Sequence, residues 1–158
     1  MPQPIRYQFS QHFNVPAREA YEWCTDYTPE DQALMQMKNA TREVQRITEG
    51  NFMLTDTFHN QGESIVKQKL VCLYPDKLMW ISTHVAGPVK HSQFVYEIKE
   101  ETATTSSLEF TALHLDYEIT EGTDKEKAKT LTKKLRKEDS DLWKHLAKEM
   151  KKELRRSK

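Results

Sequence analysis

Glycine and cysteine are scarce in this chain of 158 residues, and their scarcity excludes several kinds of functional site. Four glycines cannot supply a glycine-rich loop that cradles phosphates, and the chain contains neither a nucleophile elbow nor an HExxH helix. The two cysteines, Cys24 and Cys72, lie far apart, without the paired spacing of a zinc or redox motif. We therefore expect two buried, reduced thiols that pack as small hydrophobic side chains.

Long apolar runs are also absent. No stretch approaches the roughly 20 uncharged apolar residues of a membrane helix, and the mean hydropathy is -0.82. The opening residues show no charged segment followed by an apolar run, so we expect no cleaved secretory signal and a cytoplasmic protein. The length is typical of one domain, which predicts a single domain over residues 1–158.

The net charge of zero conceals an uneven distribution of charge. Residues 124–158 carry 14 Lys and Arg against seven Asp and Glu, whereas the rest of the chain is acidic. Such a basic segment can bind nucleic acid through phosphate contacts or touch an anionic membrane. The interleaved acids, the pI near 7.0 and the lack of a recognition motif favour a solvated helix face. We therefore predict no nucleic-acid partner and leave the oligomeric state open.

Hydrophobic periodicity predicts the order of the elements. Residues 5–15 alternate between apolar and polar side chains, as in a half-buried strand. Two short helices follow, one after Pro16 and one from Thr28 to about Met37. Turn residues then separate six stretches of period two, which predicts an antiparallel meander. These strands are expected at residues 42–49, 52–59, 64–74, 77–85, 89–99 and 104–117.

The last segment predicts one long amphipathic helix. Thr123 and Glu126 form a capping-box pattern, and apolar residues then recur at helical spacing with no glycine or proline between them. Asp139 interrupts the apolar stripe between Leu135 and Leu142. Because an unpaired buried carboxylate is costly, we expect Asp139 to lie at a solvated cavity mouth, to pair with a cation, or to bind a polar group of a ligand.

Two turns predict which face of the meander is apolar. With Pro75-Asp76 and Gly87-Pro88 as the centres of tight hairpins, one face carries Val66, Leu70, Cys72, Met79, Ile81, Phe94, Tyr96 and Ile98. The other face carries Lys67, Lys69, Gln93 and Glu97 with Trp80 and Val95. We expect the first face to cover the core, although a slip of one residue in either hairpin would invert the assignment beyond it.

Six histidines raise the question of a metal site. The same register places His84 and His91 opposite each other, but on the outer face near a turn, and no third residue has helpful spacing. We therefore predict no metal and no cofactor.

The order of strand, two short helices, six-stranded meander and long helix is that of the helix-grip fold. The segment from Gln11 to Trp23, which enters its helix through Pro16 and is followed by Asp26, resembles the start of the START-like (SRPBCC) superfamily. That superfamily includes polyketide cyclases, lipid-transfer domains and pollen allergens. The resemblance implies an α+β fold in which a curved seven-stranded antiparallel sheet, with two short N-terminal helices, grips the C-terminal helix around a cavity for a hydrophobic molecule. Helix dimensions independently favour such a cavity, because one helix about 10 Å across cannot fill the space enclosed by a sheet that curves around it.

We therefore predict binding of a hydrophobic or amphipathic, lipid- or polyketide-like molecule between the sheet and the last helix. One alternative is a cyclase or dehydratase that uses the same cavity. Another is a protein-interaction module resembling the chaperone-ATPase activators that share the fold, for which we expect a filled interior. No catalytic residue is assigned. The residues expected to bind the ligand are Tyr7, Phe9, Gln11, Leu70, Met79, Ile81, Phe94, Tyr96, Phe110, His114, Leu135, Asp139, Leu142 and Leu146.

Overall fold

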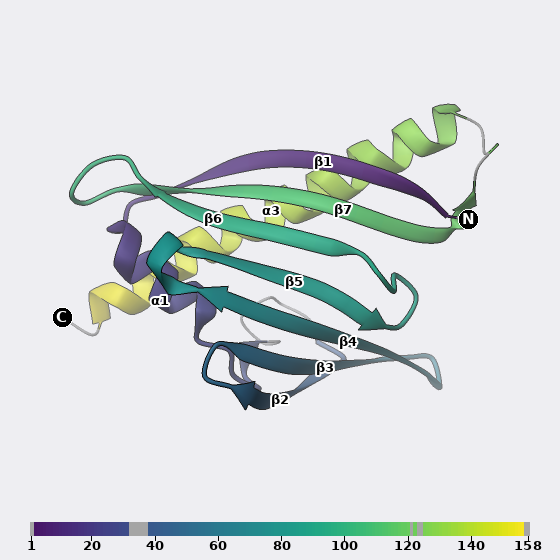
Figure 1. Cartoon of the computed structure of the whole chain (residues 1–158), viewed down its shortest axis with the longest axis horizontal. Coiled ribbons are helices and arrows are strands. Elements are labelled where there is room, and N and C mark those ends of the chain that lie inside the picture. Colours follow the sequence, from purple (N-terminus) through teal and green to yellow (C-terminus); the bar gives the residue numbers. More distant parts are fainter. Residues whose placement is uncertain (1, 32–37, 121, 123–124, 157–158) are drawn as a thin grey trace.

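Seven strands form one antiparallel sheet in a computed structural model that describes residues 2–31, 38–120, 122 and 125–156. The strand order across the sheet is β1-β7-β6-β5-β4-β3-β2, so the first strand of the chain lies beside the last (Figure 1). The strands are β1 (Pro2–Phe13), β2 (Ala40–Thr48), β3 (Asn51–Asn60), β4 (Glu63–Tyr74), β5 (Met79–Ala86), β6 (Gln93–Glu100) and β7 (Ser106–Thr120). The predicted meander and helix-grip architecture are confirmed.

Two helices accompany the sheet, α1 (Ala17–Thr25) and α3 (Lys125–Arg156). The predicted second short helix lies mostly outside the described residues, as does Thr123 of the predicted capping box. At the start of that second segment, the Asp31 carboxylate accepts hydrogen bonds of 3.1 Å from the backbone N–H and the hydroxyl of Thr28. Within the described residues, no helix combines the length and apolar character that crossing a membrane requires.

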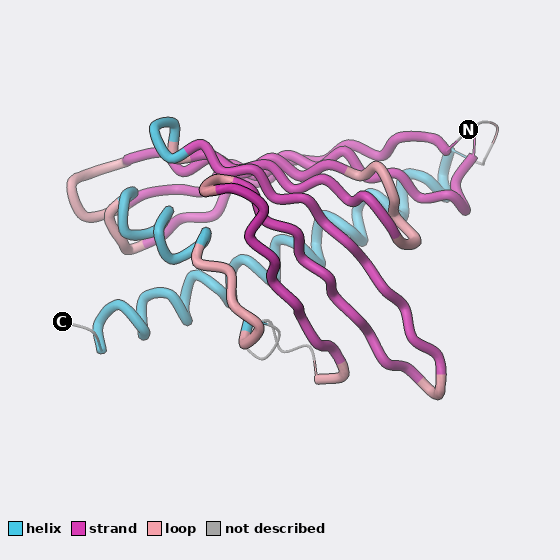
Figure 2. The backbone as a smooth tube through the Cα atoms, turned by 60° about the horizontal axis from the view of Figure 1, so that its bottom comes forward, coloured by secondary structure: helices cyan, strands magenta, loops and turns pink. Residues whose placement is uncertain are grey.

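Helix α3 covers the inner face of the sheet beside β1, and the far strands bend around it. Arg136 Nε donates a hydrogen bond of 2.8 Å to the carbonyl of Gln8, and near the other end of α3 the indole N–H of Trp23 donates to Glu153 at 2.7 Å. Figure 2 shows β2, β3 and β4 curving toward the side of the sheet on which α3 lies. The helix is thus anchored at β1 and α1, away from β2, β3 and β4.

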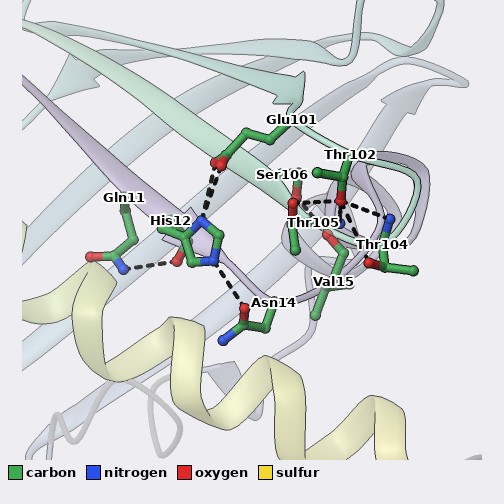
Figure 3. A network of polar contacts seen from close by, with 9 residues as sticks. All are labelled: Gln11, His12, Asn14, Val15, Glu101, Thr102, Thr104, Thr105 and Ser106. Atoms are coloured by element: carbon green, nitrogen blue, oxygen red, sulfur yellow. Dashed lines mark hydrogen bonds and ion pairs between the residues drawn. The ribbon is translucent and has the colours of Figure 1, made fainter.

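The join between β1 and α1 is held by polar contacts at one end of the sheet (Figure 3). His12 lies 3.1 Å from the Glu101 carboxylate through Nδ1 and 2.9 Å from Asn14 Oδ1 through Nε2. These bonds to Asn14 and Glu101 raise the pKa of His12. Beside them, the buried Ser106 hydroxyl donates to the carbonyl of Val15 at 2.7 Å, which fixes the chain where it enters α1.

The predicted face assignment is right for β6 and wrong for β4 and β5. Phe94, Tyr96 and Ile98 do share the inner face, but the strand partner of Tyr96 is Trp80 rather than Met79. The pairing of β5 with β6 is therefore displaced by one residue from the prediction, which reverses the faces. In the β4–β5 hairpin the pairing is displaced by two residues from the prediction, so the residues of β4 and β5 that were expected to share a face still do so.

The cause of the reversal is the connection between β5 and β6. Residues 87–92 join the strands, with Gly87 at φ 110° and His91 at φ 74°, instead of a two-residue turn at Gly87-Pro88. The His91 N–H donates to the carbonyl of His84 at 2.7 Å, which extends the pairing through the loop. Trp80, Ser82 and His84 are buried as a result.

Candidate functional site

A cavity of about 1050 Å³ lies between the inner face of the sheet and α3. Its size is at the upper end of the range typical of small-molecule sites, about 300–1,000 Å³. Strand residues of the inner face form its floor, and α1 and α3 supply the opposite wall. The interior is therefore hollow, as the comparison of one helix with a curved sheet predicts.

The middle of the floor is an aromatic row that crosses three neighbouring strands. Phe110, Tyr96 and Trp80 are successive partners across β7, β6 and β5. The rings of Trp80 and Tyr96 stack with centroids 4.7 Å apart, and Phe110 meets Tyr96 edge-on at 5.1 Å. Trp143 faces them from α3, 5.8 Å from the Tyr96 ring. Aromatic rings of this size provide the large apolar contact area that binds hydrophobic ligands.

A phenol and a carboxylate meet where α3 approaches β1. The Tyr7 hydroxyl donates a short hydrogen bond to Asp139 Oδ2. Burial raises the pKa of Tyr7, and the Asp139 charge adds to the effect. Burial also raises the pKa of Asp139, more than the hydrogen bond from Tyr7 lowers it. The sequence allowed Asp139 a solvated cavity mouth, a cation or a polar group of a ligand as its environment. In the structure Asp139 lines the cavity and accepts a hydrogen bond from another residue of the cavity wall.

An ionic cluster joins Arg42, Asp56 and Lys69, on β2, β3 and β4 of the floor, to Asp31, which precedes β2 in the chain. Arg42 donates two hydrogen bonds of 2.7 and 2.9 Å to the Asp56 carboxylate and a third of 3.1 Å to Asp31. Lys69 Nζ lies 2.9 Å from Asp56 Oδ2. Burial acts to raise the pKa of Asp56, but Arg42 and Lys69 outweigh it and hold the value at about 2. Asp56 therefore stays ionised although it lines the same cavity as the aromatic row.

Two histidines complete the polar part of the floor. Burial lowers the pKa of His84 to about 3, assisted by the charges of Lys69 and Lys67, so the imidazole is neutral at pH 7. Its Nδ1 atom has no hydrogen-bond partner within the described part of the chain. Burial also lowers the pKa of His114, which lies two strands away on β7.

The structure places nine of the predicted site residues on the cavity wall. They are Tyr7, Phe94, Tyr96, Phe110, His114, Leu135, Asp139, Leu142 and Leu146. Phe9 is buried but lies outside the cavity, stacked on Phe110 with centroids 4.6 Å apart. The Gln11 side chain bonds to the carbonyl of His12 and also lies outside the cavity.

Leu70, Met79 and Ile81 are corrections to the predicted site. They do not line the cavity, because the displaced β5–β6 pairing turns them to the outer face. Sequence reasoning missed the residues that replace them on the inner face and their neighbours, namely Arg42, Asp56, Lys67, Lys69, Trp80, Ser82 and His84. One available signal was Asp56, which continues the alternation of buried Phe52 and Leu54 and so places a charge on the apolar face.

Several solved structures share this architecture. The aromatase/cyclase ZhuI from Streptomyces sp. R1128 is 12% identical with a TM-score of 0.75, and the match covers 96% of each chain. Ara h 8.0201 is 10% identical with a TM-score of 0.67, and the match covers 94% of this chain and 98% of that one. A START superfamily protein from Mycobacterium smegmatis is also 10% identical with a TM-score of 0.67, and the match covers 92% of this chain and 98% of that one. No family model and no curated protein matches the sequence. At these identities, the similarity establishes the fold alone.

Proposed function

This chain has the helix-grip fold of the START-like superfamily, and on that basis we propose that it binds a hydrophobic or amphipathic small molecule, such as a lipid or a polyketide. The observation that carries the proposal is the cavity of about 1050 Å³ with its aromatic row. Water in contact with these rings is released when an apolar ligand replaces it, which favours binding. The few polar groups around the row would then set the orientation of the ligand.

Native mass spectrometry of protein purified from its own host tests the proposal. We expect a bound small molecule that dissociates on denaturation and whose mass identifies its class. The matched variants are Tyr96→Ala, in the aromatic row, and Tyr74→Ala, which is exposed at the end of β4. Tyr96→Ala should weaken binding about tenfold or more, because it removes most of one ring's contact area, and Tyr74→Ala should have no effect. If no ligand co-purifies and a panel of lipids and polyketides leaves the melting temperature unchanged, the proposal is wrong.

An enzyme of the cyclase or dehydratase type is a second candidate, favoured by the titratable groups that meet in the cavity. Asp139, Tyr7 and His84 all have displaced pKa values there, a property common in catalytic sites. ZhuI and StfQ, two similar structures, are named as aromatase/cyclases. In this candidate function Asp139, whose pKa is raised by burial, would donate a proton to a hydroxyl as its C–O bond breaks and it leaves as water. The neutral imidazole of His84 would accept the proton that the adjacent carbon loses.

The enzymatic candidate is tested by incubating the protein with a polyketide thioester mimic and measuring the loss of water by mass spectrometry. The wild type should accelerate the loss, and Asp139→Asn should abolish the acceleration while leaving binding of the mimic within about twofold. Binding without any conversion would leave the carrier function and refute catalysis with this substrate class. The hollow interior gives no support to the protein-interaction alternative.

A further inference from the structure

The floor of the cavity has a basic end on β4 and β5 that an entirely apolar ligand would leave without a partner. We define this basic end as Lys67, Lys69 and His84, all of which line the cavity. Lys69 and His84 are direct strand partners, so their side chains stand next to each other on the inner face. Lys67 lies two residues along β4 and therefore shares that face.

One charge at this end, that of Lys67, has no ion-pair partner among the described residues. In the ionic cluster, Arg42 and Lys69 are matched by Asp56 and Asp31. Lys67 has no carboxylate within 4.0 Å in the described part of the chain, and its ammonium instead lies 5.2 Å from the centre of the Phe58 ring. Lys67 is thus a half-buried cation that lines the cavity without belonging to an ion pair.

One ring nitrogen of His84, Nδ1, also lacks a hydrogen-bond partner among the described residues. Its side chain is on the cavity floor, the residue is only 6% exposed, and Nδ1 has no partner among the described residues. Buried polar atoms in native proteins are nearly always hydrogen-bonded, so an unpaired one at a binding site suggests a missing partner. Burial lowers the pKa of His84 most, and the charges of Lys69 and Lys67 lower it further, so both lysines place positive charge near the ring. In the tautomer that carries its proton on Nδ1, the neutral imidazole can donate a hydrogen bond to a negatively charged oxygen.

Apart from Asp56, the strand partner of Lys67, the acidic residues of the cavity lie away from this end, on α3 and in residues 26–31. Glu138 and Asp139 belong to α3, on the wall opposite the floor, and Asp139 is occupied by the Tyr7 hydroxyl. An anionic group would be repelled from that wall and attracted to the floor. This separation fixes which end of a polar ligand points toward β4.

We propose that the basic end binds an anionic oxygen, so that the ligand is an amphipathic acid whose apolar body lies on the aromatic row. This inference rests on the proposed binding function and narrows its ligand class. Carboxylates, sulfonates and ionised enols share the chemistry that the lysines and the imidazole N–H recognise. The apolar part of such a molecule would lie near Trp80 and its charged part near Lys67, at different places on the same floor.

Two fluorescent probes with the same apolar body separate this inference from the proposed function. N-phenyl-1-naphthylamine is neutral, and 1-anilinonaphthalene-8-sulfonate carries one anionic group on the same rings. Binding of each probe is titrated to the wild type, to Lys67→Met and to Lys77→Met, the control at an exposed lysine. His84→Phe, which keeps a ring but removes the N–H, is a second and independent variant.

We expect Lys67→Met and His84→Phe each to weaken binding of the sulfonated probe about tenfold, as for loss of one charge-assisted hydrogen bond. Binding of the neutral probe should change less than about twofold, and Lys77→Met should affect neither probe. If the neutral probe binds, and each variant changes the affinity for the two probes by the same factor, the acidic ligand is refuted while the proposed apolar binding site is retained. If neither probe binds the wild type, both the inference and the proposed function fail.

Discussion

Replacing Asp56 by Asn should destabilise the protein more than any comparable change at its surface. Asp56 is 1% exposed and accepts two hydrogen bonds from Arg42, whose side chain is 4% exposed. The substitution keeps the shape and removes the charge, so Arg42 is left buried with only the 3.1 Å contact to Asp31. Breaking a buried ion pair on one side costs about 3 kcal/mol or more. For a chain of this length, that loss lowers the melting temperature by roughly 6–12 °C.

The pH dependence of stability provides a second measure of the same interaction. The pKa of Asp56 is held at about 2 in the folded state, below its ordinary value of 3.8. A lowered pKa stabilises the folded state at pH values above the ordinary one, and here contributes about 2 kcal/mol at neutral pH. This contribution is lost as the pH falls from about 4 through about 2. The difference in stability between wild type and Asp56→Asn should therefore shrink over that interval.

Thermal unfolding followed by circular dichroism, at pH 7 and at steps between pH 4 and pH 2, measures both effects. The control is Asp141→Asn, the same substitution in the Lys137–Asp141 pair, whose side chains are 77% and 61% exposed. Exposed pairs of this kind contribute little, so the control should melt with the wild type. Equal melting temperatures for Asp56→Asn and the wild type at pH 7 would refute the role assigned to the ionic cluster.

Two further substitutions test the cavity wall and the chain turns. Tyr7→Phe removes the hydroxyl whose hydrogen bond lowers the pKa of Asp139 and so opposes the effect of burial. NMR titration of the Asp139 carboxyl should therefore show a higher pKa than in the wild type. An unchanged or lower pKa would contradict the hydrogen bond. Gly87→Ala should destabilise the protein more than Gly62→Ala in urea denaturation. Both glycines have a positive φ, but only at Gly87 would an added Cβ lie 2.8 Å from a backbone oxygen, the carbonyl oxygen of Val66. The Gly62 variant should lose only about 1 kcal/mol from the left-handed backbone, and equal losses would show that the close approach is relieved.

Alternation of apolar and polar residues was sufficient to predict the first strand and its buried face. Ile5, Tyr7 and Phe9 are all buried on one side of β1, as period two requires. The long C-terminal helix was predictable for a similar reason, since its apolar stripe repeats without a breaking residue. Where one face is apolar over a whole element, local sequence determines which side is covered.

The faces of β4 and β5 could not be predicted in the same way, because their inner face borders a cavity. Lys69, Ser82 and His84 point inward, where they contact the cavity or one another, while Leu70 and Ile81 are half-buried outside. Counting hydrophobic residues therefore favours the wrong face. Only the length of the loop at residues 87–92 decides the register, and its His91 adopts a left-handed conformation that is uncommon for a residue other than glycine.

The pairing of β1 with β7 constrains how the binding site is assembled. Phe9 is the strand partner of Phe110, so the earliest part of the chain completes its hydrogen bonds only after most of the chain has been made. Contacts between residues so distant in sequence slow folding, because a large loop must close before they form. Tyr7 and its contact with Asp139 depend on the same closure. A newly synthesised chain that stops before β7 could form hairpins, yet it would present an open sheet edge in place of an enclosed site.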